Sequence, residues 1–161
     1  MRHDHLFAFE SDFVATLRCV PMAVRFKLDR VGIKLTLRQW STFTDPVRRT
    51  LLLTPCGSPD EQRDYRARLE TMVREATGET ARPLPATDVL IWDETDGPPP
   101  AITAFAEIAG VPPPSTADWR RLANLERFVL AKLSRDNHDN VNFIPAMREF
   151  GLLATSKAPA T

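Results

Sequence analysis

Apolar residues recur at helical spacing along most of this chain, and proline and glycine mark where the runs stop. The clearest run follows the segment 58–61, which combines a capping box with a proline at the first helical position. Its apolar row is Tyr65, Leu69, Met72, Val73 and Ala76. Gly78 can end the run because glycine adopts the left-handed conformation without steric cost. The pattern predicts an amphipathic helix between Ser58 and Gly78.

Similar punctuation predicts a helix between Pro21 and Gly32. Apolar residues recur at helical spacing within it, with proline at the start and glycine after the end. The next segment, residues 33–37, alternates apolar and polar positions, and Thr36 and Gln39 then have the spacing of a capping box. We interpret 33–37 as an extended connector lying on the core, with a small strand as the alternative.

A shorter helix is expected closer to the N-terminus. Ser11 or Asp12 could cap it, because both side chains can accept a hydrogen bond from a backbone N–H of the first turn. Phe13, Val14 and Leu17 would form its apolar face. The pattern therefore predicts a helix that runs to about Leu17.

One ordered block of features occurs twice, over residues 26–53 and 104–133. Each block contains a helix, a glycine, a connecting segment, a tryptophan and a capped leucine-rich helix that carries an arginine. The matching pairs are Gly32 and Gly110, Trp40 and Trp119, the caps Asp45 and Asn124, and Arg48 and Arg127. We interpret the blocks as an internal two-fold repeat in which both tryptophans are core residues. Chance recurrence of common helix punctuation is the alternative.

Prolines interrupt the chain between the two blocks. Five of them fall within residues 79–100 and exclude regular helix over most of that segment. The same segment contains the apolar run 89–92, which is too apolar to be left in water. We expect Trp92 to anchor this run to the core, with an exposed partner-docking motif as the alternative.

Together these elements predict an all-α fold, as a single compact multi-helix domain over residues 1–161. Within it we expect an N-terminal helical unit (6–78), a Pro-rich central connector (79–100), a C-terminal helical unit (101–152) and a flexible tail (153–161). With 161 residues, of which 43% are hydrophobic, the chain can bury a substantial core.

The charge balance argues against nucleic acid as a partner. Lys and Arg total 21, as do Asp and Glu, so the formal net charge is zero, whereas nucleic-acid binders normally carry a basic excess. A DNA-binding helix-turn-helix over 32–53 is the weakest alternative, because leucines occupy positions that should face solvent. The basic run from Arg25 to Arg38 is interrupted by Asp29 and is interpreted as a solvated face.

Targeting signals and cysteine usage in the sequence indicate a cytoplasmic protein. No apolar run reaches the roughly 18 residues that a membrane span requires, and the first residues lack the pattern of a signal peptide. Cys19 and Cys56 are too few for a disulfide framework, so we expect free thiols.

The polar loop after the second leucine-rich helix is the main candidate site. It contains Arg135, Asp136, His138, Asp139, Asn140 and Asn142. A calcium-loop template fails there, because Val141 and Met147 occupy the positions of the required glycine and glutamate. The simplest interpretation is a helix-terminating loop whose side chains cap backbone groups, and the alternatives are partner contact and ligand binding.

No known catalytic motif occurs in the sequence. A phosphate-binding glycine loop, a nucleophile elbow and a zincin motif are all missing. A catalytic Cys19 would need His138 as its base, and burial is the more usual fate of a free cysteine. We therefore expect a protein that is not an enzyme and has no catalytic residues.

Both ends of the chain resemble the nitrate reductase-associated protein family, a family of short bacterial proteins best known in cyanobacteria. The N-terminal resemblance runs through residues 7–14, 17–22, 24–25, 27–29, 32–35 and Trp40. The C-terminal resemblance comprises 127–128, Leu130, 132–135, His138, Asn140, 142–143, 145–146 and 149–150. In the family pattern proline usually stands at Asp136 and glutamate at Asp139.

The resemblance implies a cytosolic accessory protein that assists maturation or activity of molybdenum-dependent assimilatory nitrate reductase. The implied partner is the reductase or the machinery that delivers its molybdenum cofactor; no cofactor of its own, nucleic acid or membrane is expected. The hypothetical partner-binding residues are Arg18, Arg135, His138, Asp139, Asn140 and Asn142. The alternative is a small-molecule or metal-binding domain that uses Cys19, Cys56 and His138, although their spacing does not resemble a structural zinc site.

Overall fold

The structure, a computed structural model, describes residues 6–93, 96–135 and 140–153, and the rest of the chain, including the expected tail from residue 154, lies outside this part. Helices dominate it, which confirms the all-α prediction. Contacts divide the chain into two compact units, residues 1–89 (unit 1) and 90–161 (unit 2). The boundary falls inside the predicted connector 79–100, and the single-domain organisation stays a prediction.

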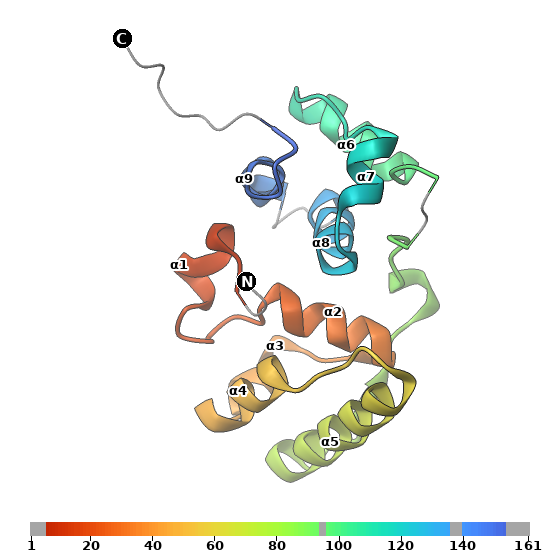
Figure 1. The fold of residues 1–161 in the computed structure, drawn as a ribbon. Helices are drawn as coiled ribbons and strands as arrows, with labels where there is room; N and C mark the ends of the chain where they lie inside the picture. The colour runs from red at the N-terminus through yellow and green to blue at the C-terminus, as the bar shows by residue number, and fades with distance from the viewer. Residues whose placement is uncertain (1–5, 94–95, 136–139, 154–161) are drawn as a thin grey trace. The chain divides into compact units, whose positions relative to one another are not determined.

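Unit 1 is built around a long helix, α5 (Figure 1). Its elements are η1 (Ala8–Glu10), α1 (Ser11–Val14), α2 (Met22–Val31), β1 (Ile33–Lys34), α3 (Leu37–Thr42), α4 (Asp45–Leu53), α5 (Pro59–Thr77), β2 (Arg82–Pro83) and η2 (Ala86–Asp88). Helix α5 packs against α2, α3 and α4. Tyr65, Leu69 and Val73 on α5 are all 0% exposed, which confirms three of the five predicted apolar positions, whereas Met72 is half-buried and Ala76 is exposed.

Three of the predicted helix ends of unit 1, at Ser58, Thr36 and Gly32, form as the sequence indicates. The Ser58 hydroxyl accepts a hydrogen bond from the Glu61 N–H, and the Thr36 hydroxyl accepts one from the Gln39 N–H. Gly32 ends α2 in the left-handed conformation, with φ of 72°. These ends depend only on neighbouring residues, which is why the sequence pattern predicts them.

The segment after α2 adopts the alternative that we considered less favoured. Ile33 and Lys34 form β1, which pairs antiparallel with β2 through Pro83 and Arg82. The backbone N–H of Leu84 continues this contact to the carbonyl of Gly32 at 2.8 Å. The partner strand lies about fifty residues further along the chain, so local alternation alone did not reveal it.

Unit 2 is centred on α8. Its described elements are α6 (Pro100–Ala109), α7 (Thr116–Arg121), α8 (Asn124–Arg135), η3 (Asn140–Asn142) and α9 (Phe143–Glu149). Helix α8 contacts α6, α9 and η3, and Figure 1 shows α9 near α8 within this unit. The side chains of Phe128, Val129, Leu130 and Leu133 on α8 are 0% exposed, which makes α8 the main core helix of unit 2.

In each unit an arginine side chain contacts the backbone carbonyl and the ring of a buried tryptophan, and we call this arrangement the tryptophan–arginine clamp. In unit 1 the Arg48 Nε donates to the Trp40 carbonyl at 3.2 Å, and in unit 2 the Arg127 Nε donates to the Trp119 carbonyl at 2.9 Å. Each guanidinium also donates to the next carbonyl along the chain and lies 5.8 Å from the tryptophan ring centroid. Both tryptophans are 0% exposed, which confirms them as core residues.

The elements around each clamp also match. Helices α2 and α6 each have ten residues and end at a left-handed glycine, Gly32 or Gly110. Helices α3 and α7 each have six residues and an N-terminal hydroxyl cap, from Thr36 or Ser115. The local geometry therefore follows the predicted repeat in both units.

The expected caps of the leucine-rich helices are wrong by one residue in both copies. Helix α4 begins at Asp45 itself, and the hydroxyl of the preceding Thr44 accepts from the Val47 N–H at 3.4 Å. The Asp45 carboxylate instead accepts from the Arg49 Nε at 2.8 Å. Helix α8 likewise begins at Asn124. The two errors agree because the two copies share one register.

The apolar run between the units is more exposed than expected. Val89 is 55% exposed and Ile91 is 58% exposed, whereas Trp92 is half-buried. Anchoring of this run therefore fits Leu90 and Trp92, which are half-buried, better than Val89 and Ile91.

Candidate functional site

The hypothetical partner-binding residues fall into three groups. Arg18 belongs to unit 1, whereas Arg135, Asn140 and Asn142 belong to unit 2. His138 and Asp139 lie outside the described residues. The assignment of these six residues to a partner surface stays a prediction.

The unit 2 part is an exposed turn on a buried base. Arg135 is the last residue of α8 and is exposed. Within η3 the side chain of Val141 is 78% exposed, and its neighbours Asn140 and Asn142 are half-buried. Phe143 follows at 0% exposure and fixes the turn to the core, since η3 contacts both α8 and α9. Val141 was missed from the sequence because only the fold shows that this apolar side chain points to solvent.

The unit 1 part is the segment 17–21, which we call the Leu17 turn. Leu17 has φ of 58°, a conformation that costs a non-glycine residue on the order of 1 kcal/mol. Its carbonyl accepts hydrogen bonds from the Trp40 indole at 2.8 Å and from the Arg48 Nη1 at 3.2 Å. The helix predicted to reach Leu17 ends at Val14 instead. Leu17 is nevertheless 1% exposed, so its apolar signal reflects burial rather than helix.

A buried carboxylate fixes the other end of the Leu17 turn. The Glu10 Oε1 accepts from the Met22 N–H at 3.0 Å, and its Oε2 accepts from the Phe7 N–H, also at 3.0 Å. Glu10 is 1% exposed and neutralises the positive N-terminal end of α2. The Arg25 Nε also donates to the Val20 carbonyl at 3.1 Å. Glu10 was missed from the sequence because its partner lies twelve residues away.

The turn presents two side chains of different chemistry. Arg18 is exposed, and it makes no hydrogen bond or ion pair in the described part of the chain. Cys19 is half-buried and carries a free thiol. Both ends of the turn are fixed by backbone contacts, so the Arg18 side chain extends from a rigid base.

The alternative metal site stays untested. Cys19 and Cys56 are both free thiols, as expected. Among the residues that the structure describes, no three histidine, cysteine, aspartate or glutamate side chains lie close enough together to hold a metal ion. His138, the third proposed ligand, lies outside them.

Cys56 lies in a basic cluster that closes the C-terminal end of α4. The Lys27 Nζ donates to the carbonyls of Leu52 and Thr54, both at 2.7 Å, and the Arg30 Nη1 donates to the Cys56 carbonyl at 3.3 Å. Burial lowers the pKa of Lys27 and raises the pKa of the Cys56 thiol. The interpretation of the basic run as a solvated face is therefore wrong for Lys27 and Arg30, which cap backbone carbonyls.

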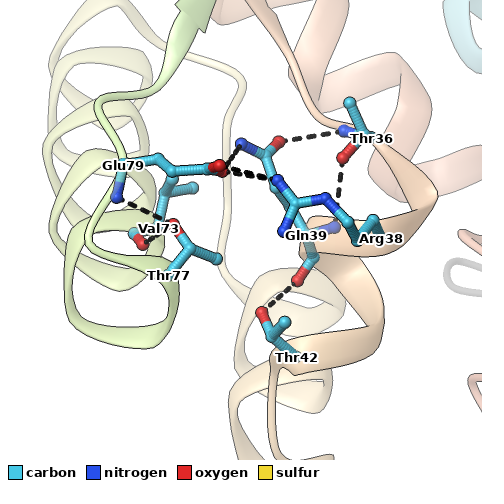
Figure 2. Close-up of polar contacts among 7 residues, drawn as sticks. All are labelled: Thr36, Arg38, Gln39, Thr42, Val73, Thr77 and Glu79. Atoms are coloured by element: carbon cyan, nitrogen blue, oxygen red, sulfur yellow. Dashed lines mark hydrogen bonds and ion pairs between the residues drawn. The ribbon is translucent and has the colours of Figure 1, made fainter.

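A polar cluster joins α3 to the end of α5 (Figure 2). The Glu79 carboxylate accepts from the Arg38 Nη2 at 2.8 and 2.7 Å and from the Gln39 Nε2 at 3.1 Å. The Gln39 and Arg38 hydrogen bonds hold the pKa of Glu79 below its usual range. A carboxylate held ionised in this way accepts hydrogen bonds and is poorly suited to donate a proton, so we assign the cluster a structural role.

The fold and these surfaces define an all-α protein with two related helical units, each of which presents exposed side chains on a turn, Arg18 in unit 1 and Val141 in unit 2. The chain belongs to the family of conserved nitrate reductase-associated proteins, whose family model matches residues 6–150. This finding confirms the resemblance at the two ends of the sequence. No curated protein and no solved structure matches the chain. Within its described helices, none is long and apolar enough to span a membrane.

Proposed function

We propose that this protein is a non-enzymatic, cytoplasmic accessory protein of molybdenum-dependent assimilatory nitrate reductase. It would assist maturation or activity by direct contact with the reductase or with the machinery that delivers the molybdenum cofactor. The family description supports the link to nitrate reductase. The proposed role is contact with another protein, and no catalytic residue is assigned.

One observation carries the choice of contact surface in unit 2. Val141 is 78% exposed, lies between two asparagines and follows the exposed Arg135 at the end of α8. An apolar side chain with a polar and charged rim is typical of protein–protein contacts. The buried residues of α9 hold this surface in place, so binding would cost little conformational entropy.

Co-purification from cells grown on nitrate tests this proposal. Tagged full-length protein should retain nitrate reductase or cofactor-delivery proteins, and Val141→Glu should reduce the retained amount about tenfold, because it buries a charge in the contact. The double variant His138→Ala, Asn140→Ala should reduce it as well. Leu53→Glu is the matched control, since Leu53 is 56% exposed and lies in unit 1.

Two results would contradict the proposal at different levels. If wild-type protein retains neither the reductase nor a delivery protein, the accessory function is wrong. If Val141→Glu and the double variant both retain the partner as wild type does, the function stands and the assigned surface is wrong.

A further inference from the structure

Positive charge gathers around the Leu17 turn in unit 1. The guanidinium of Arg48 binds the carbonyl of Leu17, and the guanidinium of Arg25 binds the carbonyl of Val20. Arg18 lies between these two carbonyls in the sequence and is exposed. Three arginines therefore act on a segment of four residues.

Described carboxylates do not neutralise two of these charges. Arg18 has no ion pair in the described part of the chain, and the hydrogen bonds of Arg48 run only to backbone carbonyls there. Glu10 is tied to this turn through Met22, but both of its oxygens accept backbone N–H groups and it is 1% exposed. The turn therefore keeps a positive field toward solvent.

The other clamp shows that this exposure is not a requirement of the fold. Arg127 makes the same contacts to its tryptophan and is buried at 8% exposure, whereas Arg48 is half-buried. The clamp thus works with a covered guanidinium in unit 2. In unit 1 the guanidinium also reaches the carbonyl of Leu17 and remains partly open to solvent.

We propose that the Leu17 turn docks an acidic segment of a partner protein. Arg18 would pair with a carboxylate, since a guanidinium offers two parallel donors that match its two oxygens. The charge of Arg48 would attract neighbouring carboxylates along the same segment. Arg25 and Arg48 already use donors on backbone carbonyls, so the charge is spread along the turn. A spread charge suits an extended acidic segment better than one compact anion.

This inference deepens the proposed function, because the segment would belong to the reductase or to the delivery machinery. It can still be tested without either of them. A glutamate-rich peptide is titrated into the nitrogen-15-labelled full chain at low ionic strength and followed by NMR. The Trp40 indole N–H, which binds the Leu17 carbonyl, and the Nε–H of Arg18 and Arg48 should shift together. Added salt should weaken the binding, because the contact is electrostatic.

Charge reversal locates the contact. Arg18→Glu should weaken peptide binding about tenfold, since it replaces an attractive charge by a repulsive one. Arg68→Glu is the matched control, because Arg68 is also exposed and makes no ion pair in the described part of the chain. Arg18→Lys should retain part of the affinity. Circular dichroism of each variant verifies that it is folded.

Three outcomes would overturn the inference. They are shifts spread equally over Arg68 and other exposed arginines, an equal loss from Arg68→Glu, and displacement of the peptide by stoichiometric inorganic phosphate, which would indicate a compact-anion site. If the reductase co-purifies but the peptide does not bind at Arg18, the Leu17 turn is not a docking site and the proposed function stands. If the peptide binds at Arg18 but neither the reductase nor a delivery protein co-purifies, the proposed accessory function is wrong and docking of an acidic segment at the Leu17 turn is supported.

Discussion

Lys27 in unit 1 and Phe105 in unit 2 both lie five residues before the glycine that ends their helix. The ammonium of Lys27 lies 5.7 Å from the ring centroid of Tyr65 on α5. Phe105 makes an edge-to-face contact with Phe143 on α9, with 4.9 Å between centroids. The two repeats thus use one position to contact a buried aromatic ring of the helix that closes the unit, but through a cation in one case and a ring in the other.

The length of the leucine-rich helix explains this difference. Helix α4 has nine residues and ends at Leu53, so the carbonyls of Leu52 and Thr54 need donors, and Lys27 supplies them. Helix α8 has twelve residues and continues through the equivalent positions, Ala131 and Leu133. Its Ala131 carbonyl accepts from the Ser134 hydroxyl at 3.0 Å within the helix itself, so the facing position need not supply a donor there and can be aromatic. The comparison shows that one repeat can carry different chemistry where its helices end at different points.

The largest expected effect concerns the two clamp arginines. Arg127→Met should lower the free energy of unfolding by about 3 kcal/mol, and Arg48→Met by about half of that, because water can reach the carbonyls that a half-buried arginine leaves. Chemical denaturation measures both, and hydrogen exchange should show lost protection in unit 2 for Arg127→Met and in unit 1 for Arg48→Met. Arg74→Met, an exposed substitution on α5, is the control. Equal losses in the free energy of unfolding for the two clamp variants would contradict the idea that burial of the arginine sets the size of the effect.

A smaller loss of stability is expected when the side chain five residues before the terminal glycine, Lys27 in unit 1 or Phe105 in unit 2, is replaced. Lys27→Met should cost about 2 kcal/mol, because it leaves two carbonyls at the end of α4 without their donor. Phe105→Lys should cost a similar amount, since it removes the contact with Phe143 and places an ammonium next to that buried ring. Lys27→Arg, which keeps donors and charge, should recover part of the loss. If Phe105→Lys were neutral in denaturation, helix length would not explain the difference.

The smallest effect concerns pH and the Glu79 cluster, which belongs to unit 1 alone. The pKa of Glu79 is lowered from 4.5, so its contribution to stability is present above that value and is lost as pH falls through the folded-state pKa. Wild type should therefore exceed Glu79→Gln in stability near neutral pH, and the gap should close as acidification takes the pH below the folded-state pKa of Glu79. Glu75→Gln, an exposed variant in the last turn of α5, serves as control. A gap that stays constant with pH would contradict the ionised cluster.

Local sequence signals predicted much of the helical scaffold. The capping box at Ser58, the left-handed glycines and the eight-residue spacing from Trp40 to Arg48 all involve neighbouring residues, and all appear in the structure as hydrogen bonds or helix ends. The repeat was visible for the same reason, since tryptophan, arginine and glycine are distinctive and their spacing is preserved. The cap of α4 was wrong by one residue because Thr44 and Asp45 both suit a cap.

Signals that depend on distant partners were missed or misread. No sequence signal singled out Glu10; Lys27 and Arg30 looked solvated, and the turn at Leu17 looked helical. Each depends on a partner at least twelve residues away, at Met22, in the segment 52–57 or at Trp40. The outward direction of Val141 likewise became clear only with the fold.

By itself the sequence determined the all-α class, the spacing of the repeat and the family, because these depend on short-range patterns and on distinctive residues. Only the tertiary structure decided which charged side chains bind backbone groups of the protein and which remain exposed. Arg30, Lys27 and Glu10 form hydrogen bonds with backbone groups, whereas Arg18 remains exposed on a fixed turn. The physical reason is that an unpaired buried carbonyl or N–H is costly, so the fold assigns charged side chains to the helix ends that need them.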